Sequence, residues 1–371
     1  MKSLVLSILA ILFTFFVSGQ TTNIVILNQE EKASLKQLIK TNKDVERLYK
    51  SILYEAESGL NNKPNPIETV YYEGLLETHP KRTRTMQSFA DIDYVISLIY
   101  ASYGNDKSEF ANKAKEIIVA WANTYKPTGN PINENKFNAF YWGYHLFKDE
   151  FDKAEQQIVE NWLLEIAQKE MKRERTPNNN WEAKRCKMIG IIGCILENEE
   201  LKDYSIKHFK RYITTAYYAD GTSRDLEQRD ALHYHVSGLK PCISAFINLS
   251  QMDKRFDLYP FVSENNSSIK KSTEYVVPFA TGEIQREEWR NTKVKLDKER
   301  AAAGLAEYQP GKLFEPEKAY ELFEWACYYH PEWVSIFEKE EKITSWVGLL
   351  NSPFIRRTIL ENRNTNTIHV R

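Results

Sequence analysis

Cysteine is scarce in this sequence, with 4 cysteines among 371 residues: Cys186, Cys194, Cys242 and Cys327. Their spacing contains no CxxC pair and no Cys/His cluster with the separation of zinc ligands. A disulfide-rich scaffold and a structural zinc site are therefore excluded. We expect buried free thiols, although an exported protein can carry one disulfide.

An excess of charge of either sign is also missing, because 50 Lys and Arg residues balance 51 Asp and Glu residues. A near-neutral chain has no overall attraction for nucleic acid or for a membrane surface, and this balance still allows a local basic groove for an acidic substrate. P-loop, GxGxxG, GxSxG, HExxH and EF-hand patterns are all absent. We therefore expect no nucleic-acid partner, no nucleotide cofactor and no bound metal.

Long apolar runs are absent after the N-terminal residues. Residues 1–19 combine one lysine, an apolar run over 4–17 and two small residues, the pattern of a secretory signal peptide that is too short for a membrane span. We predict a signal peptide over 1–19, with cleavage in the region 18–20. The remaining chain, 20–371, is expected to be periplasmic or secreted, without membrane insertion once the signal is removed.

Strand-like alternation of apolar and polar residues is nearly absent, and helical spacing dominates from about residue 28 onward. Apolar residues recur at three- and four-residue spacing in the segments 30–60, 88–104, 108–125, 155–171, 184–218, 240–252, 314–333 and 342–362. Hydrophobic residues make up 42% of the chain, enough for a sizeable core. We predict an all-α fold, in which successive helical hairpins form a single-domain (α/α) toroid with its long loops at one end.

Two helix boundaries are suggested by local signals within this pattern. Ser88-x-x-Asp91 resembles a helix N-cap, and Gly104 is placed where the same helix would end. The basic segment 79–88, which contains Lys81 and Arg82, would then lie just before the helix. It either lines a cleft for an acidic polymer or is simply solvated.

The segment RDALHYH, residues 229–235, concentrates polar residues around a tyrosine. Asp225 and Gln228 resemble a capping box, and a helix that continues to about residue 249 would place Leu232, Val236, Leu239 and Ile243 on one apolar face. Tyr234 lies away from that face, and Arg229 stacks on His233 by helical spacing. This polar face is either functional or an ordinary solvated or hydrogen-bonded surface.

Three consecutive asparagines, Asn178, Asn179 and Asn180, precede a helix predicted over 182–196. Asparagine amides and the N–H groups at a helix start donate hydrogen bonds, so this arrangement suits a carboxylate. A plain polar loop with Trp181 docked on the core is the alternative. A second polar loop, over 127–136, carries asparagines and an acidic residue with the same two interpretations.

Four motifs occur in order along the chain: WANTYKPTGNPINENK (121–136), NNNWEAKRCKMIGIIG (178–193), DGTSRDLEQRDALHYHVSGL (220–239) and KVKLDKERAAAGLAEY (293–308). Together they resemble the alginate lyase superfamily of polysaccharide lyases, most closely the family thirty-eight type, whose members act on alginate or glucuronan. The resemblance covers most of residues 80–330. It implies an (α/α) toroid and metal-independent β-elimination of uronic-acid polymers without a cofactor, leaving a 4,5-unsaturated uronate end.

The resemblance also implies site residues. Tyr234 matches the tyrosine that acts as base and acid, while Asn179 and Arg229 match the groups that neutralise the substrate carboxylate. His235 is a further catalytic candidate, and either it or His233 is an alternative base. The residues expected to bind neighbouring uronates or to stack on sugar rings are Lys81, Arg82, Asn133, Trp142, Asn178, Trp181, Arg185 and His233.

Two positions depart from the pattern of these relatives. Asn180 stands where classical alginate lyases have a neutralising histidine, and Ser237 stands where they often have a second, catalytic tyrosine. The C4–C5 chemistry does not separate mannuronate from glucuronate, because these two sugars differ at C2. The expected partner is therefore an acidic polysaccharide or oligosaccharide of either kind.

Two other function classes remain open from the sequence. A glycoside hydrolase on the same toroid would use paired carboxylates, such as Asp230 with Glu227 or Glu134. A non-catalytic glycan-binding protein of the cell envelope would use the abundant aromatic residues, which include 8 Trp and 21 Tyr. In each case we expect a monomer or a small homo-oligomer.

Overall fold

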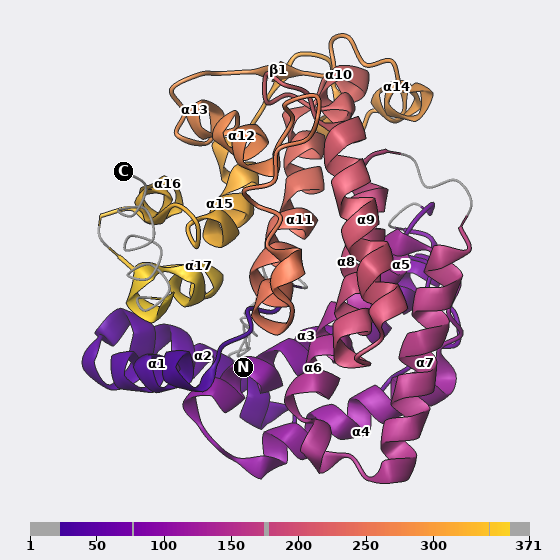
Figure 1. The fold of residues 1–371 in the computed structure, drawn as a ribbon, viewed down its shortest axis with the longest axis vertical. Helices are drawn as coiled ribbons and strands as arrows, with labels where there is room; N and C mark the ends of the chain where they lie inside the picture. The colour runs from indigo at the N-terminus through magenta and orange to yellow at the C-terminus, as the bar shows by residue number, and fades with distance from the viewer. Residues whose placement is uncertain (1–22, 76–77, 174–177, 341, 357–371) are drawn as a thin grey trace, which may run out of the picture.

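The computed structural model describes residues 23–75, 78–173, 178–340 and 342–356. Helices dominate these residues and build one (α/α) toroid, so the predicted all-α class is confirmed (Figure 1). The predicted signal peptide over 1–19 lies outside the described residues.

The helices of the first half are α1 (Gln29–Thr41), α2 (Lys43–Ser58), α3 (Pro80–Gly104), α4 (Ser108–Thr124), α5 (Pro131–Glu134), η1 (Asn135–Phe137), α6 (Asn138–Leu146), η2 (Lys148–Glu150) and α7 (Lys153–Met171). The second half begins with α8 (Asn180–Ile195), α9 (Glu199–Ala216), α10 (Arg224–Arg229), α11 (Leu232–Met252), η3 (Lys254–Phe256), α12 (Ile269–Glu274) and α13 (Val277–Ala280). It ends with α14 (Lys295–Ala302), η4 (Ala306–Tyr308), η5 (Pro316–Ala319), α15 (Tyr320–Ala326), η6 (Pro331–Trp333), α16 (Val334–Phe337) and α17 (Trp346–Asn351).

The only strands within the described residues are β1 (Glu287–Glu288) and β2 (Lys312–Leu313), which pair antiparallel. They belong to the segment 286–314, called the flap below, which also contains α14 and η4. In Figure 1 the flap, α10 and the start of α11 lie at the same end of the molecule. The expectation that long loops gather at one end therefore holds for this part of the chain.

The helices follow one another around the toroid. α8 packs between α9 and α11, while α3 packs against both α2 and α4 (Figure 1). The ring closes where the last helices approach α2 and α3. A cavity of about 820 Å³ lies at this seam, and its walls come from α2, α3, α15 and α17.

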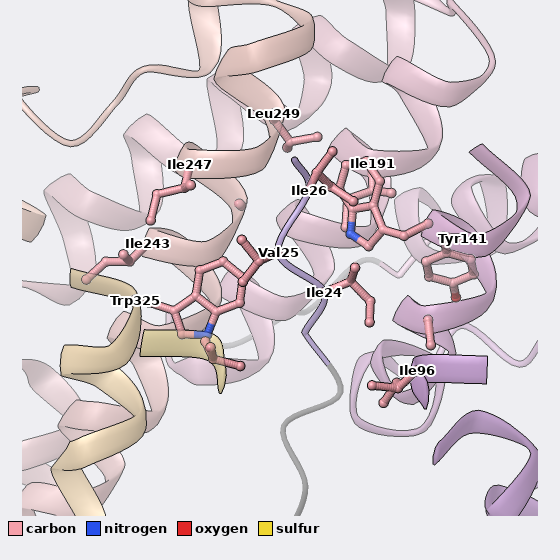
Figure 2. Packing of buried hydrophobic residues seen from close by; sticks show 14 of the residues in the cluster. Ile24, Val25, Ile26, Ile96, Tyr141, Ile191, Ile243, Ile247, Leu249 and Trp325 are labelled. Carbon is pink, nitrogen blue, oxygen red and sulfur yellow. The ribbon is translucent and has the colours of Figure 1, made fainter. Parts of the chain in front are cut away.

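An extended segment, Asn23–Leu27, runs through the centre of the toroid (Figure 2). Its apolar side chains pack against α8 and α11, and Ile24 and Val25 have no exposed surface. Side chains satisfy its backbone: Asn248 Nδ2 donates to Ile24 O at 2.6 Å, and Tyr103 Oη donates to Val25 O at 2.9 Å. This segment fills the middle of the toroid without joining a sheet.

The predicted helix start at Ser88 is wrong, because α3 begins two turns earlier at Pro80. Proline is well suited to the first helical position, and His79 caps the helix by accepting a hydrogen bond from Lys81 N at 3.2 Å. Ser88 is fully buried inside the helix. The predicted end of this helix at Gly104 is confirmed.

The four cysteines are free and buried, as the sequence predicted. Within the described parts of the chain, no helix has both the length and the apolar character needed to cross a bilayer.

Candidate active site

The N-terminal end of α8 carries the asparagine run. α8 begins at Asn180, two residues before the predicted start, and Asn179 is its N-cap. The side-chain Oδ1 of Asn179 accepts a hydrogen bond from Trp181 N at 3.0 Å. The amide Nδ2 of Asn179 thus keeps its donor capacity beside the N–H groups of the first helical turn. The backbone N–H groups of Asn180, Trp181 and Glu182 already have acceptors, so the Asn179 amide is the donor that remains at this helix end.

Asn180 faces inward, with 6% of its surface exposed. Its backbone N–H donates to Asp225 Oδ2 at 3.1 Å, and its side-chain Oδ1 accepts from Lys184 Nζ at 3.1 Å. Asn180 therefore holds Asp225 and Lys184 in place, and it does not present the cationic group that a histidine would.

Asp225 joins α8 to α10. Burial raises the pKa of Asp225 to about 6, against the opposing effects of the Asn180 N–H, Arg229 and Lys184. Arg229 follows Asp225 by one helical turn at the end of α10. The contacts Asn180–Asp225 and the proximity of Asp225 to Arg229 place the asparagine run and the RDALHYH segment in one site.

The predicted single helix through RDALHYH is wrong, because the chain breaks at Asp230 between α10 and α11. Asp230 adopts a left-handed backbone conformation with φ 51°. Its carboxylate accepts hydrogen bonds from Arg286 Nη2 and Asn291 N, both at 2.9 Å, and its carbonyl oxygen accepts from Trp289 N at 2.8 Å. These bonds to the flap offset the cost of the strained backbone.

The predicted capping box at Asp225 is also wrong. Ser223 is the N-cap of α10, and its Oγ accepts a hydrogen bond from Leu226 N at 3.2 Å. Asp225 instead occupies the first turn, where an acidic residue favours the helix dipole and where its side chain reaches α8.

The break at Asp230 brings Arg229 onto Tyr234 rather than onto His233. The guanidinium carbon of Arg229 lies 3.7 Å from the centre of the Tyr234 ring, and Arg229 Nη1 donates to Asp297 Oδ1 at 3.2 Å. Arg300, from α14 of the flap, donates to the Tyr234 hydroxyl at 3.4 Å. Two arginines thus hold the phenol, one at its face and one at its oxygen.

Tyr234 is protonated in the resting site. Burial raises the pKa of Tyr234 well above its usual value; Arg229 opposes this shift, and Tyr308 and Asp297 reinforce it. Desolvation therefore outweighs the effect of Arg229 on the pKa of Tyr234 and favours the protonated phenol. Ser237, one turn later on α11, is half-buried and adds no second phenol.

His233 is partly exposed beside Tyr234, with ring centres 4.3 Å apart. The buried Glu288 of β1 orients His233 by accepting its backbone N–H at 3.1 Å, and its second carboxylate oxygen lies 3.4 Å from His233 Nδ1. A carboxylate beside Nδ1 favours the tautomer that leaves Nε2 as an acceptor. His233 therefore has the arrangement of an oriented base.

His235 points into the core and has 1% of its surface exposed. Its Nδ1 lies 2.8 Å from Ser223 Oγ and its Nε2 lies 3.0 Å from Ser272 O, so both ring nitrogens are engaged. Burial lowers its pKa to about 4. The expected catalytic contact of His235 is incompatible with this position, where the ring ties α11 to α10 and α12.

Arg185 and Asn133 were expected to bind substrate, but both are structural. Arg185 is 2% exposed, and its guanidinium is shared between Glu182, at 2.5 and 2.9 Å, and Tyr204 Oη, at 2.6 Å. Asn133 is 6% exposed, and its Oδ1 accepts from Glu73 N at 2.9 Å. Neither side chain has capacity left for a sugar.

The two basic candidates of α3 lie on the outer side of the segment 70–75. Lys81 is exposed, with its ammonium 4.7 Å from the centre of the Tyr71 ring. Arg82 donates hydrogen bonds to Tyr72 O at 3.2 Å and to Leu75 O at 3.0 Å. Arg82 thus fixes the path of this segment, while Lys81 remains open to solvent.

The two tryptophan candidates differ in burial. Trp181 is half-buried, with Arg173 5.2 Å from its ring centre, and Asn178 beside the asparagine cap is half-buried as well. Trp142 is 1% exposed and belongs to the core, so its expected stacking on a sugar ring is wrong.

The carboxylates proposed for a hydrolase do not form a catalytic pair. Glu134 is fully buried, and its neighbour Glu170 has a pKa raised to about 9 by burial and by Glu134 itself. Glu227 is exposed, and its bonds to Lys293 and Tyr218 lower its pKa. Asp230 is committed to the helix break. The general acid that inverting or retaining hydrolysis needs is missing from this set.

Within the described ranges, no group of three or more His, Cys, Asp and Glu side chains is placed to hold a metal ion. Three acidic groups at the site are engaged with neighbouring basic side chains: Asp297 with Arg229, Asp230 with Arg286, and Glu288 with His233.

Sequence reasoning missed four residues of this site. Lys184 follows Asn180 by one helical turn, so helical spacing alone points to it. The flap residues Trp289, Arg300 and Tyr308 come together only through tertiary packing, with Trp289 and Tyr308 ring centres 4.9 Å apart. The motif 293–308 was recognised, but nothing local in it indicates which side chains reach Tyr234.

The fold is an all-helical toroid, and one end of it carries an amide at a helix start, an arginine, and an oriented tyrosine and histidine. These features together are those expected of a polysaccharide lyase. Comparison with family models agrees, since the alginate lyase family matches residues 34–287. The chain belongs to the alginate lyase family and is a polysaccharide lyase. Among curated proteins, none matches the chain significantly.

Solved structures share the fold at low sequence identity. An alginate lyase from Bacteroides ovatus is 13% identical with a TM-score of 0.61, and the match covers 88% of this chain and 97% of the other. Alginate lyase A1-III from Sphingomonas species A1 is 15% identical with a TM-score of 0.52, covering 78% and 92%. A variant of A1-III in complex with a tetrasaccharide is 14% identical with a TM-score of 0.52, covering 80% and 95%.

Proposed function

We propose that this protein cleaves a uronic-acid polymer, polymannuronate or glucuronan, by β-elimination at the junction of α10 and α11. The observation that carries the proposal is the contact of Arg229 with the face of Tyr234, 3.7 Å from the ring centre, beside the capped start of α8. A cation, amide donors and a protonated phenol then surround one position. The solved structure of an alginate lyase variant in complex with a tetrasaccharide supports a glycan substrate.

The first chemical task is to make the C5 proton of a uronate removable. The proton is poorly acidic while the C6 carboxylate keeps its charge, because removal builds further negative charge on that group. Asn179 Nδ2 would donate to the carboxylate, and Arg229 would supply a positive charge. Preorganised donors of this kind stabilise the developing charge in the transition state.

The second task is proton transfer. Tyr234 holds its proton at neutral pH because burial raises its pKa, so it is in the form needed to protonate the O4 leaving group. His233 is the adjacent side chain with an acceptor nitrogen, oriented by Glu288. We assign removal of the C5 proton to His233 Nε2 and delivery of a proton to O4 to Tyr234. The products are a 4,5-unsaturated uronate end and a new hydroxyl end.

This assignment also defines the substrate stereochemistry. His233 and Tyr234 are consecutive at the start of α11, and their rings lie 4.3 Å apart on the same side. A base and an acid on one side require the C5 hydrogen and O4 to lie on one face of the sugar ring. Mannuronate and glucuronate both meet this condition, whereas guluronate, the C5 epimer of mannuronate, does not.

A substrate panel tests the proposal. The purified protein is incubated with polymannuronate, glucuronan, polyguluronate and hyaluronan, and the ultraviolet absorbance of the conjugated double bond is followed. We expect absorbance to rise with polymannuronate or glucuronan and to stay flat with polyguluronate. Absorbance that rises only with polyguluronate would contradict the proposed geometry.

Export to the periplasm or the medium remains a prediction from the residues over 1–19. A monomer or small homo-oligomer likewise remains a prediction. An enzyme for polymeric uronans is useful outside the cytoplasm, which agrees with a secretory signal.

A further inference from the structure

Lys184 lies on α8, one helical turn after Asn180 at the start of that helix. Its side chain remains partly accessible to solvent, yet burial is the largest cause of a pKa lowered to about 8. Lys184 projects from the same end of α8 as Asn180, whose Oδ1 accepts its Nζ at 3.1 Å.

Two more lysines lie close enough to Lys184 to repel it: Lys136 from η1 and Lys240 from α11. Lys240 is paired with Glu321 at 2.5 Å. Within the described residues, neither Lys184 nor Lys136 forms an ion pair, and Lys136 lies 4.3 Å from the centre of the Tyr72 ring. Lys184 and Lys136 thus lie near each other on two separate elements, with Asp225, Glu73 and Asp93 as the acidic groups around them.

Two acidic groups, Asp225 and Glu73, lie near Lys184, and neither forms an ion pair with it. Asp225 accepts the Asn180 N–H, and the remaining acidic neighbour is Glu73, in the segment held by Asn133. The other charged neighbour, Lys187 on α8 itself, adds repulsion. An anion placed beside Lys184 would gain attraction from Lys184 and Lys136, against repulsion from Asp225 and Glu73.

We propose that Lys184, supported by Lys136, binds the carboxylate of a substrate uronate next to the one held by Asn179 and Arg229. The inference rests on the proposed function, since it assigns a further part of the same polyanionic chain. Lys184 supplies a cation beside Asn180, which itself offers none. A neutral sugar at this subsite would gain nothing from Lys184, so the subsite selects for consecutive uronates.

Steady-state kinetics of Lys184→Met and Lys184→Arg at pH 7 and pH 9 test the proposal on oligomers of the active uronan. When a variant can no longer form a charge-assisted hydrogen bond to the substrate, KM is expected to rise about tenfold or more. We expect that rise for Lys184→Met at pH 7, with kcat changed much less. Lys184→Arg should keep a KM near that of the wild type.

The pH dependence separates a binding role from a structural one. As pH rises through about 8, the free wild-type enzyme loses the Lys184 charge, so its KM should increase. Lys184→Arg should lack this increase, because a guanidinium stays charged. An unchanged KM in Lys184→Met, or the same alkaline rise of KM in Lys184→Arg, would overturn the proposal.

Lys187→Met is the matched control, because Lys187 is also a desolvated lysine of α8 but its Nζ donates to Asn23 Oδ1 at 2.6 Å. Its KM should equal that of the wild type. Thermal unfolding of each variant establishes that it is folded. A KM increase in Lys187→Met as large as in Lys184→Met would contradict the assignment to Lys184.

Binding measurements keep this inference separate from the proposed function. If the wild type cleaves no uronan, the proposed function fails, and calorimetry with oligomannuronate and oligoglucuronate then tests the subsite alone. Binding by the wild type that weakens about tenfold in Lys184→Met would support the subsite without the reaction. Equal binding by both proteins, or binding by neither, would overturn it.

Discussion

The centre of the toroid and its open end both contain buried polar groups, but they use them differently. At the centre, Lys187 is bonded to Asn23, and Asn248 is bonded to the backbone of the central segment. The open end is the end that carries the start of α8, the α10–α11 junction and the flap. There, Lys184 and Asn179 each make one side-chain hydrogen bond, to Asn180 and to Trp181 N, and keep further N–H donors. Lys184 and Lys187 lie on one helix, and burial lowers the pKa of both.

The contrast shows that burial alone does not mark a functional group. What distinguishes the open end is hydrogen-bonding capacity that the protein leaves unfilled, next to Lys184, which forms no ion pair with the described residues. Variants at the open end should therefore change catalysis with little effect on stability. Variants at the centre should change stability with little effect on catalysis.

The largest effect is expected for Tyr234→Phe, which removes the proton that is delivered to O4. Loss of general acid catalysis corresponds to roughly a 10²- to 10⁴-fold fall in kcat. The rate of absorbance increase on the preferred uronan measures it. Tyr100→Phe at the centre is the counterpart: its hydroxyl accepts from Val25 N at 3.2 Å, so the variant should lose about 1 kcal/mol of stability and keep its kcat. If the kcat of Tyr234→Phe stays within a few-fold of the wild-type value, Tyr234 is not the general acid.

Asn179→Asp should separate capping from catalysis. Aspartate caps a helix as well as asparagine does, so stability should be retained. The variant loses the amide donor and repels the substrate carboxylate, and we expect kcat/KM to fall by about 10²-fold. Asn42→Asp, at the N-cap of α2, is the matched control and should leave kcat/KM unchanged. Equal kinetics for the two variants would mean that Asn179 is only a cap.

Lys187→Met should change the pH dependence of stability. The pKa of Lys187 is lowered from 10.5 to about 7, so between these values the unfolded chain binds more protons than the folded one. Wild-type stability should therefore rise with pH across that window, by up to about 1.4 kcal/mol per pH unit. Lys187→Met should flatten the rise and be more stable at pH 7. Parallel stability curves from urea unfolding at several pH values would refute the assignment.

An effect of opposite sign is expected for Glu170→Gln. The pKa of Glu170 is raised from 4.5 to about 9, so the folded protein retains a proton that the unfolded chain releases within this range. Wild-type stability should fall with rising pH through the window, and the variant, which is neutral throughout, should fall less. Urea unfolding at pH 5 and pH 8 measures the difference. A steeper decline in the variant would be inconsistent with a protonated Glu170.

Helical periodicity was sufficient to predict the toroid, because amphipathic spacing directly reflects which face of a helix is buried. Positions set by contacts distant in sequence were not predictable in this way. The break at Asp230 depends on Arg286 and Asn291 in the flap, and the central segment depends on side chains from α3 and α11.

The candidate site was predicted in part. Asn179, Arg229, His233 and Tyr234 lie where one site requires them, whereas His235, Asn133 and Arg185 turn inward. Residue type and local spacing do not reveal burial: His235 follows Tyr234 directly on α11, but its own ring turns into the core, toward Ser223 and Ser272. Lys184 follows Asn180 by one helical turn, so helical spacing alone could have predicted that it lies beside the asparagine run.

The chemical identity of the new chain ends tests the central claim most directly. An oligomer of the preferred uronan is digested in ¹⁸O-labelled water, and the products are weighed by mass spectrometry. Elimination at the α10–α11 junction predicts two products whose masses sum to that of the substrate, one with an unsaturated end, and no ¹⁸O in either. Products that together gain one labelled water would show hydrolysis and contradict the account.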